Sequence, residues 1–594
     1  MDDVALSSSD FVGEAQALQT YWSQRNTQMV LERSVVALDK PVAKKGNFNW
    51  TINAPKTLYD TTVALLSAVT PRIQLPLTIN FTEEEREKIS KAERFLLGIF
   101  RALEDRHYNA GRGSWLRELA YWVCSGWYAV QVIVHKPLPG KVEFWAELFD
   151  PMTVYPEWDQ FGLKRFARVF QTDYFNAMAM AEYWGMKDSL KAYDPQAQVQ
   201  VVNYWKRDMT DQGPAVYNGV SVGTTVLKPL QRESSFKRIP ILTGSSTGSP
   251  DRSRPDWQQN MGESIIRANM DVYDYQNQIL RKKAQLLDEM TGPDVVTKTK
   301  SGRPAVKKED FGGGHRRIIP LAVGEEITPF RSVDLPPEIN TLFTTLDGYA
   351  QRGGLPYAVY GNIPFELSGF AIAQLMAAIR YKAGPYANTL EMVLGKIACE
   401  LIEQYRDGVF PAVKLATVNP LSQRRGIFFM EEFAKKDIPE TTFVKVSIPL
   451  TSSMDRMQQI EFARRAMEPP QLLSRERLYD EVLDIQDTDQ ELARIMDDQT
   501  MELQGVKQIM VIQKIRELST VAEVGGRLDE AGMLREYADM LVAQGSGAQN
   551  PNEAPAAKPK QAMPQAMPPE MGTRNPDVQR VIENRVPPRP RAKR

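Results

Sequence analysis

Apolar residues recur at helical spacing through most of the first 110 residues. The pattern is clearest after the segment Thr82–Glu85, where the Thr82 hydroxyl and the Glu85 carboxylate can cap each other's free backbone N–H groups. The apolar residues behind this cap include Ile89, Leu96 and Leu103. Their interval of seven places them on one helix face. The aromatic-rich segment Trp115–Trp127 predicts a further helix, packed in a core.

From Tyr128 the pattern changes to alternation, which is typical of strands. The segments YAVQVIVHK and VEFWAEL predict a hairpin, with its turn at Pro137–Gly140. Further strand candidates lie at 165–171, 199–207 and 239–244. A mixed α+β body is therefore predicted over residues 1–256.

The next stretch predicts two helices separated by a small insert. Residues 257–290 show helical periodicity and end at a Gly-Pro pair, which stops helices. Residues 291–332 are rich in β-formers and glycine, and residues 333–353 predict a second helix, whose opening prolines cost no hydrogen bond.

A Pro- and Tyr-containing loop at 354–369 leads into a long helix predicted at 370–407. Gly384 and Pro385 interrupt its apolar pattern. A proline inside a helix removes one hydrogen bond and clashes with the preceding turn, at a cost of about 3 kcal/mol, so a kink is predicted there.

The remaining chain divides by pattern into three parts. Residues 408–452 alternate as strands, and residues 453–545 show helical periodicity, with a capping box at Thr488–Glu491. Residues 546–594 are rich in Pro, Ala, Gln and Met and lack periodicity, so we expect them to be disordered. They end in the basic segment PPRPRAKR.

Composition narrows the classes of function. The 594 residues carry 73 Lys+Arg and 74 Asp+Glu, a net charge of -1, whereas tight DNA binders usually carry a basic excess. Any DNA contact is therefore expected to be local or weak. The two cysteines, Cys124 and Cys399, support no disulfide framework, and three histidines make metal or histidine chemistry improbable. No metal or cofactor is predicted, and neither a signal peptide nor a membrane span is expected.

The order of these elements resembles that of portal proteins, the head–tail connectors of tailed bacteriophages. Three stretches are similar to the family: Ala146–Pro156 resembles a hairpin of its body, Gly353–Ile372 resembles the loop entering its long helix, and Pro469–Asp489 resembles its short C-terminal helices. The resemblance covers about residues 1–545.

The resemblance implies an α+β, mostly helical ring subunit. Its parts would be a wing (1–256, with return strands at 408–452), two stem helices (257–290 and 333–353), a β clip (291–332), a tunnel loop (354–369), a long kinked helix (370–407) and a helical crown (453–545).

What such a subunit does also follows from the resemblance. A homo-oligomeric ring, typically a dodecamer, would sit at one capsid vertex of the virion after assembly in the host cytoplasm. Double-stranded DNA would pass through it during packaging and ejection, with transient contacts that do not depend on sequence. The ring would dock the terminase and the tail adaptor or head-completion proteins, and it would contact the major capsid and scaffold proteins.

Candidate contact residues follow from these parts. The tunnel-loop candidates, for DNA or a neighbouring subunit, are Tyr357, Tyr360, Asn362, Phe365 and Glu366. The clip candidates form a local basic excess that could meet phosphates or an acidic partner: Lys298, Lys300, Arg303, Lys307, Lys308, Arg316 and Arg317. The stem candidates for the channel are Arg281, Lys282 and Lys283. For each of these sets, the alternative is that the side chains are only solvated and have no contact role. The basic tail, Arg585 to Arg594, has two open interpretations: contact with packaged DNA, or no role.

Two other classes of function remain as alternatives. Gly244–Gly248 matches the G-x-S-x-G pattern of serine hydrolases, with Ser246 as nucleophile, but that pattern needs a helix directly behind the serine and a histidine such as His315. A capsid or scaffold subunit is the other alternative. No phosphate-binding G-x-x-x-x-G-K-[ST] loop occurs, so the chain is not the packaging ATPase.

Overall fold

The computed structural model describes residues 10–40, 49–68, 71–76, 82–138, 141–183, 185–186, 196, 198–211, 213–291, 295–298, 326–329, 337–355, 359, 369–418, 428–440, 443–448, 460–461, 463–467, 474, 478, 495–496, 499–500, 504–524 and 527–545. The chain forms two compact units, Met1–Thr488 and Asp489–Arg594. Their boundary falls inside the stretch 453–545 that the sequence grouped as one helical block.

The first unit begins with helices, as predicted. These are α1 (Asp10–Tyr21), α2 (Ser23–Ala37), α3 (Ala54–Ser67), α4 (Glu83–Asn109) and α5 (Trp115–Cys124), with the short strand β1 (Arg72–Gln74) before α4. The capping box of α4 is confirmed: Glu85 N donates to Thr82 Oγ1 (3.3 Å) and Thr82 N donates to Glu85 Oε2 (2.9 Å). The predicted helix 115–127 is too long, because Gly126 turns the chain with φ +96° and a strand begins at Trp127.

Two antiparallel sheets follow. In the first, β2 (Trp127–Leu138) pairs with β3 (Lys141–Leu148) and with β9 (Ile241–Ser245). The second has five strands in sequence order: β4 (Val154–Asp159), β5 (Gly162–Asp173), β6 (Gln198–Thr210), β7 (Gly213–Val222) and β8 (Thr225–Arg232). The strand candidates correspond to β2, β3, β5, β6 and β9. The sequence analysis missed β4, β7, β8 and helix α6 (Tyr174–Tyr183).

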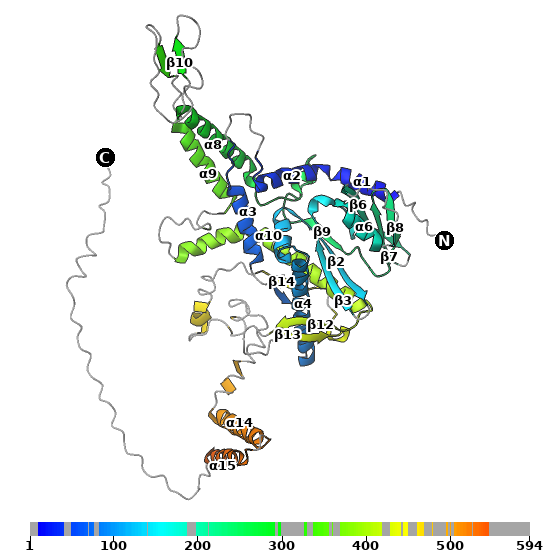
Figure 1. Cartoon of the computed structure of the whole chain (residues 1–594), viewed down its shortest axis with the longest axis vertical. Coiled ribbons are helices and arrows are strands. Elements are labelled where there is room, and N and C mark those ends of the chain that lie inside the picture. Colours follow the sequence, from blue (N-terminus) through cyan, green and yellow to red (C-terminus); the bar gives the residue numbers. More distant parts are fainter. Residues whose placement is uncertain are drawn as a thin grey trace, which may run out of the picture. The chain divides into compact units, whose positions relative to one another are not determined.

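The main core forms where α10 (Gly369–Asp407) meets α4, α5 and the hairpin β2–β3 (Figure 1). Phe95, Leu119, Val132 and Leu394 are fully buried in it. A second cluster forms where α1 covers the five-stranded sheet, and it contains Phe11, Trp22, Trp127, Tyr155 and Tyr204. The tryptophans of α5 and β2 therefore lie in cores, as the sequence predicted.

The predicted helix at 257–290 is wrong over its first turns. It is divided into α7 (Trp257–Asn260), the 3-10 turn η3 (Arg267–Asn269) and α8 (Met270–Thr291). The break centres on Gly262, which packs so closely on Trp127 that a Cβ there would lie 2.0 Å from the indole nitrogen. Close tertiary packing therefore overrides the helical periodicity at this point.

The elements after α8 occur in the predicted order. They are β10 (Val295–Lys298), β11 (Glu326–Pro329), α9 (Pro337–Gly353), α10, β12 (Val413–Val418), β13 (Phe428–Phe433), the 3-10 turn η6 (Lys435–Asp437) and β14 (Lys445–Ser447). All the pairings among them are antiparallel: β10 with β11, β12 with β13, and β14 with β1 of the N-terminal part. The fold of this unit is thus mixed α+β, as predicted.

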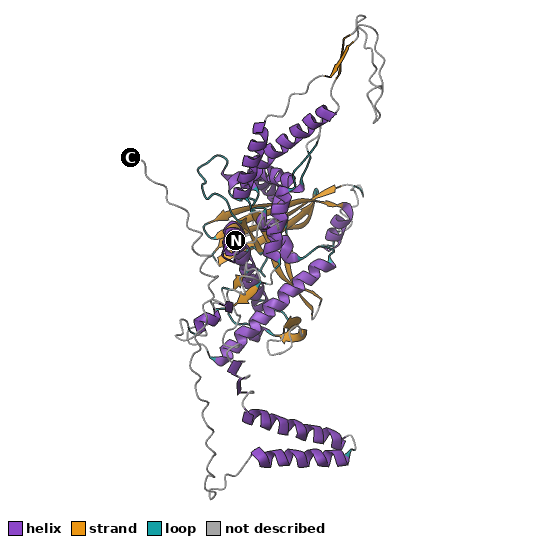
Figure 2. Cartoon of the chain, turned by 90° about the vertical axis from the view of Figure 1, so that its left-hand side faces the viewer, coloured by secondary structure: helices purple, strands orange, loops and turns teal. Residues whose placement is uncertain are grey.

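The second unit contains a helical hairpin of α14 (Gln504–Val524) and α15 (Leu528–Gly545) (Figure 2). The Ser519 hydroxyl donates to the carbonyl of Ala531 (3.0 Å), and Arg516 pairs with Asp539 across the two helices (3.1 Å). The predicted capping box at Thr488–Glu491 and the tail 546–594 lie outside the described residues.

Candidate functional site: the helical hairpin α8–α9 and its base

Helices α8 and α9 lie side by side, and β10 and β11 lie between them in the sequence (Figure 1). The two short strands pair in register from Val295 opposite Pro329 to Lys298 opposite Glu326. Because the pairing is antiparallel, the chain leaves along α8 and returns along α9. The region 270–353 is therefore a helix pair that carries a small two-stranded ribbon.

The three stem cations have different surroundings. Arg281 Nε donates to the carbonyl of Trp50 (2.9 Å), which ties α8 to the segment before α3. Lys283 Nζ donates to Asn340 Oδ1 of α9 (2.7 Å) and lies 5.0 Å from the centre of the Phe343 ring. Lys282 is exposed. Of the three predicted channel cations, Arg281 therefore attaches α8 to the segment before α3, Lys283 joins α8 to α9, and Lys282 faces solvent.

The base of the hairpin is closed by a buried amide. Asn269, which is 2% exposed, donates to the carbonyl of Ala350 (2.8 Å) and to the Tyr273 hydroxyl (3.2 Å). Gly353 lies directly against it, because a Cβ at this position would be 1.9 Å from Asn269 Oδ1. The sequence identified Gly353 only as the end of a helix, whereas the structure shows that the close approach of α9 to Asn269 requires glycine.

An ion pair joins the same base to α2. Arg267 of η3 donates to Glu32 Oε1 (2.9 Å) and to Asn260 Oδ1 (3.3 Å). Glu32 is 4% exposed. Burial raises the pKa of Glu32 to about 7, against the opposing effect of the Arg267 charge. The start of the hairpin is thus attached to α2 through a carboxylate that titrates near neutral pH.

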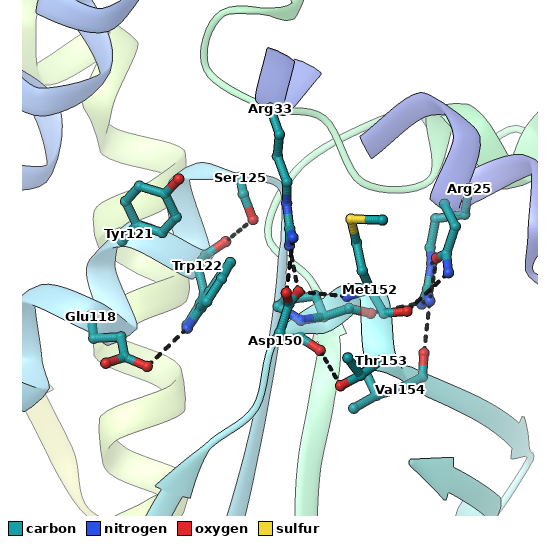
Figure 3. A network of polar contacts seen from close by, with 12 residues as sticks. Arg25, Arg33, Glu118, Tyr121, Trp122, Ser125, Asp150, Met152, Thr153 and Val154 are labelled. Carbon is teal, nitrogen blue, oxygen red and sulfur yellow. Dashed lines mark hydrogen bonds and ion pairs between the residues drawn. The ribbon is translucent and has the colours of Figure 1, made fainter. Parts of the chain in front are cut away.

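The stretch Ala146–Pro156 forms a polar network with α2 (Figure 3). The Arg33 guanidinium binds both carboxylate oxygens of Asp150 (2.9 and 2.5 Å) and lies 5.0 Å from the centre of the Trp122 ring. Asp150 also accepts the N–H of Met152 (2.9 Å), which caps the short turn η1 (Pro151–Thr153). Asp150 therefore fixes both its own turn and the position of α2.

Arg25 is the second anchor of this network. Its Nη2 donates to the carbonyls of Val154 (2.7 Å) and Pro151 (3.1 Å), and its guanidinium lies 4.9 Å from the ring centres of both Trp22 and Trp127. Burial lowers the pKa of Arg25 to about 9. Sequence reasoning did not single out Arg25. The signal that could have identified a buried arginine is its position three residues after Trp22, on the apolar face of the helix.

Most of the other candidate residues lie outside the described residues. These are all five tunnel-loop candidates (Tyr357, Tyr360, Asn362, Phe365 and Glu366) and six of the clip candidates (Lys300, Arg303, Lys307, Lys308, Arg316 and Arg317). Lys298 is described through its backbone, at the end of β10. Gly384 and Pro385 lie within α10, which continues through them, and a kink there stays a prediction.

The serine hydrolase pattern does not form a nucleophile elbow. The Ser246 hydroxyl donates to the carbonyl of Val123 (2.7 Å), and β9 is followed by irregular chain until α7 begins at Trp257. His315 lies outside the described residues. Within the described part of the chain, no cluster of three or more His, Cys, Asp or Glu side chains could hold a metal ion, and no helix is long and apolar enough to cross a membrane.

Comparison with known proteins gives limited similarity. No protein-family profile and no curated protein matches the chain. Among solved structures, a chain of the "Virion of native gene transfer agent (GTA) particle" aligns at 11% identity and a TM-score of 0.40, over 77% of this chain and 93% of that one. A chain of the "Neck of empty GTA particle computed with C6 symmetry" aligns at 12% identity and a TM-score of 0.37, over 73% and 90%. Similarity at this level assigns neither a family nor a function.

Proposed function

We propose that this chain is a portal subunit of a tailed bacteriophage, many copies of which form the ring through which double-stranded DNA enters and leaves the capsid. The observation that carries the proposal is the folding of residues 270–407: α8, the strand pair β10–β11, α9 and then the 39-residue helix α10 with Pro385 inside it. The sequence analysis predicted this order of a helix, a small β insert, a second helix and a long helix.

Exposed apolar residues on the helix pair support assembly with further copies. On α9, Leu342 and Tyr349 are 51% and 50% exposed, and their interval of seven places them on one face. On α8, Leu287 is 60% exposed. A helix pair with apolar residues in solvent is suited to pack against another protein surface. In a head-to-tail assembly, one surface of each copy packs against a different surface of the next copy. If the rotation from copy to copy adds up to a full turn, the product is a closed ring.

The charge balance fits a channel for moving DNA. Duplex DNA carries one negative charge for about each 1.7 Å of its axis, so a strongly basic tunnel would hold it and oppose sliding. This chain has a net charge of -1. In the proposed ring, the exposed Lys282 and the tunnel-loop and clip candidates make local, transient contacts. The ring also docks terminase, tail adaptors and the capsid and scaffold proteins.

Particle shape distinguishes the portal from the capsid or scaffold alternative. Purified chain should form closed rings in negative-stain images, with a hole wider than the roughly 20 Å duplex, a width in line with its groove dimensions. Light scattering on the same sample gives the number of 67.2 kDa copies. Monomers, or closed shells without a central hole, would overturn the proposal.

A pair of variants tests whether the helix pair forms the ring contacts. Leu342→Glu and Tyr349→Glu place a charge on the exposed stripe of α9 and should convert rings to monomers without unfolding the chain. The matched control is Phe175→Glu on α6, where the side chain is 72% exposed and lies outside the helix pair. Rings that survive both α9 variants would show that this stripe is not an interface.

A deletion tests the tunnel loop. Replacing residues 356–368 by a short Gly-Ser linker keeps Leu355, which is 2% exposed and belongs to the core. Rings should still form, but packaging of DNA into empty heads by terminase, or its retention afterwards, should fall. Unchanged packaging and retention would remove the role proposed for Tyr357, Tyr360, Asn362, Phe365 and Glu366.

A further inference from the structure

A cavity of about 470 Å³ with aromatic walls opens between α1, β4 and α7 of the first unit. Trp22, which is 1% exposed, lies at its floor. The rings of Trp158 and Trp257 stand edge-on to Trp22, with centroids 6.2 and 5.9 Å away. Tyr21, 52% exposed, lies 6.3 Å from Trp257 at the rim. The size is that of a ligand or peptide site.

Two carboxylates line one side of this aromatic cavity. Glu14 of α1 and Glu157 of β4 both pair with the guanidinium of Arg165, and Glu157 also lies 3.8 Å from Lys164 Nζ. The Tyr204 hydroxyl also donates to Glu14. The cluster is therefore neutral, but the side chains of Glu14 and Glu157 are 29% and 30% exposed. Because a carboxylate has lone pairs for several hydrogen bonds, an arginine or lysine entering from solvent can still bind to Glu14 and Glu157.

The ring of Trp257 shows how a guanidinium can be held in this cavity. Arg252, on the exposed loop after β9, places its guanidinium 5.6 Å from the centre of the Trp257 ring. An indole face attracts a guanidinium through its negative quadrupole and stacks on its plane. Because Arg252 is exposed on an irregular loop, an incoming arginine can take its place over Trp257.

Grooves with aromatic walls and carboxylates on one side suit a proline-rich segment that also carries basic residues. Proline-rich segments dock between aromatic side chains, because they are already extended and lose little conformational entropy on binding. Basic residues between the prolines add contacts to carboxylates and to indole faces. The fitting occupant is therefore a short segment in which proline alternates with arginine.

The chain itself supplies such a segment. Residues 585–594 read RVPPRPRAKR, with three prolines, five basic residues and no acidic residue. They end the stretch 546–594, which lies outside the described residues. We propose that the cavity lined by Tyr21, Trp22, Trp158 and Trp257 binds the segment 585–594 of a second copy of this chain. Copies held in one assembly would present the segment at a high effective concentration.

A peptide titration tests the proposal directly. The titrant is a fluorescein-labelled peptide of residues 585–594, and the receptor is the full-length chain with its own segment disabled by Arg589→Gln and Arg591→Gln. Anisotropy should show saturable binding. Trp257→Ala and Tyr21→Ala in the receptor should each weaken it at least tenfold. The matched control is Trp50→Ala, which removes a 58% exposed tryptophan outside the cavity and should leave binding unchanged.

Changes in the peptide keep the test independent of receptor folding. A peptide with Pro588→Ala and Pro590→Ala, and another with Arg589→Gln and Arg591→Gln, should each bind at least tenfold more weakly. Absent binding, or equal binding to the Trp257→Ala receptor, would overturn the proposal. So would equal binding of the peptide with Pro588→Ala and Pro590→Ala, because charge attraction alone would then explain the signal. The titration needs no ring, so its failure and a failure of the proposed function are separate results.

Discussion

The close contact between Gly353 and Asn269 allows a test with two identical substitutions on one helix. Gly353→Ala would place a Cβ 1.9 Å from Asn269 Oδ1 and 2.6 Å from its Cγ. Asn269 cannot move aside freely, because its amide holds the carbonyl of Ala350 in a buried hydrogen bond. At Gly348, also in α9, an added Cβ would meet no atom within 4 Å.

The expected effects have opposite signs. Overpacking at Gly353 costs about 1–3 kcal/mol, and displacing the buried Asn269 amide from its partner costs about 1–3 kcal/mol more. The higher helix propensity of alanine offsets about 1 kcal/mol of this loss in stability. Gly353→Ala should therefore destabilise the chain by about 1–5 kcal/mol. Gly348→Ala meets no clash and should stabilise it by about 1 kcal/mol.

Thermal denaturation measures both variants, and hydrogen exchange of α8 and α9 locates the effect. Gly353→Ala should lower the midpoint and speed exchange at the base of the hairpin, while Gly348→Ala should raise the midpoint. Adding Asn269→Ala to Gly353→Ala removes the clashing amide, so the double variant should be more stable than the sum of the single effects. Equal midpoints for the two glycine variants, or strict additivity, would refute this account of the hairpin base.

Three further substitutions address other contacts. The pKa of Glu32 is raised from 4.5 to about 7 in the folded chain, so the folded state binds the proton more tightly than the unfolded state. The resulting contribution to the free energy of unfolding is about 3 kcal/mol. It is fully present below pH 4.5 and is lost as the pH rises through 7. Glu32→Gln should flatten the stability profile between pH 4.5 and 8, and profiles that run parallel would contradict this. Asp150→Asn should cost about 1–2 kcal/mol by removing the charge that faces Arg33, and the loss should shrink in high salt. Gly395→Ala would place a Cβ 2.6 Å from the carbonyl oxygen of Val444 and should cost about 1–3 kcal/mol, seen as faster hydrogen exchange in β14.

Local signals in the sequence predicted the elements that depend on neighbouring residues. The capping box at Thr82 marks the start of α4, and the prolines before Glu338 mark the start of α9. Alternation over Tyr128–Leu148 predicted the hairpin β2–β3. Each of these patterns is contained in a few consecutive residues, so no distant contact was needed to recognise it.

Elements shaped by distant contacts were missed. Strand β7 is buried along most of its length, so it shows no alternation of apolar and polar residues. The break between α7 and α8 depends on Gly262 meeting Trp127, a residue 135 positions earlier in the chain. The closing of the hairpin base depends on Asn269 reaching Ala350 across 81 positions. Neither partner can be identified from one sequence, because the pairing exists only once the chain has folded.

Helix α2 has contacts at both ends, one with the aromatic cavity and the other with the base of the α8–α9 hairpin. Trp22, at its N-terminal end, forms the floor of the aromatic cavity, and Arg25 fixes that end to the turn before β4. Near its other end, Glu32 holds Arg267 at the base of the α8–α9 hairpin. Trp22 and Glu32 are ten residues apart, or about 15 Å along a helix. Arg25 and Glu32 therefore fix the two ends of one helix, the first to the start of the five-stranded sheet and the second to the base of the α8–α9 hairpin.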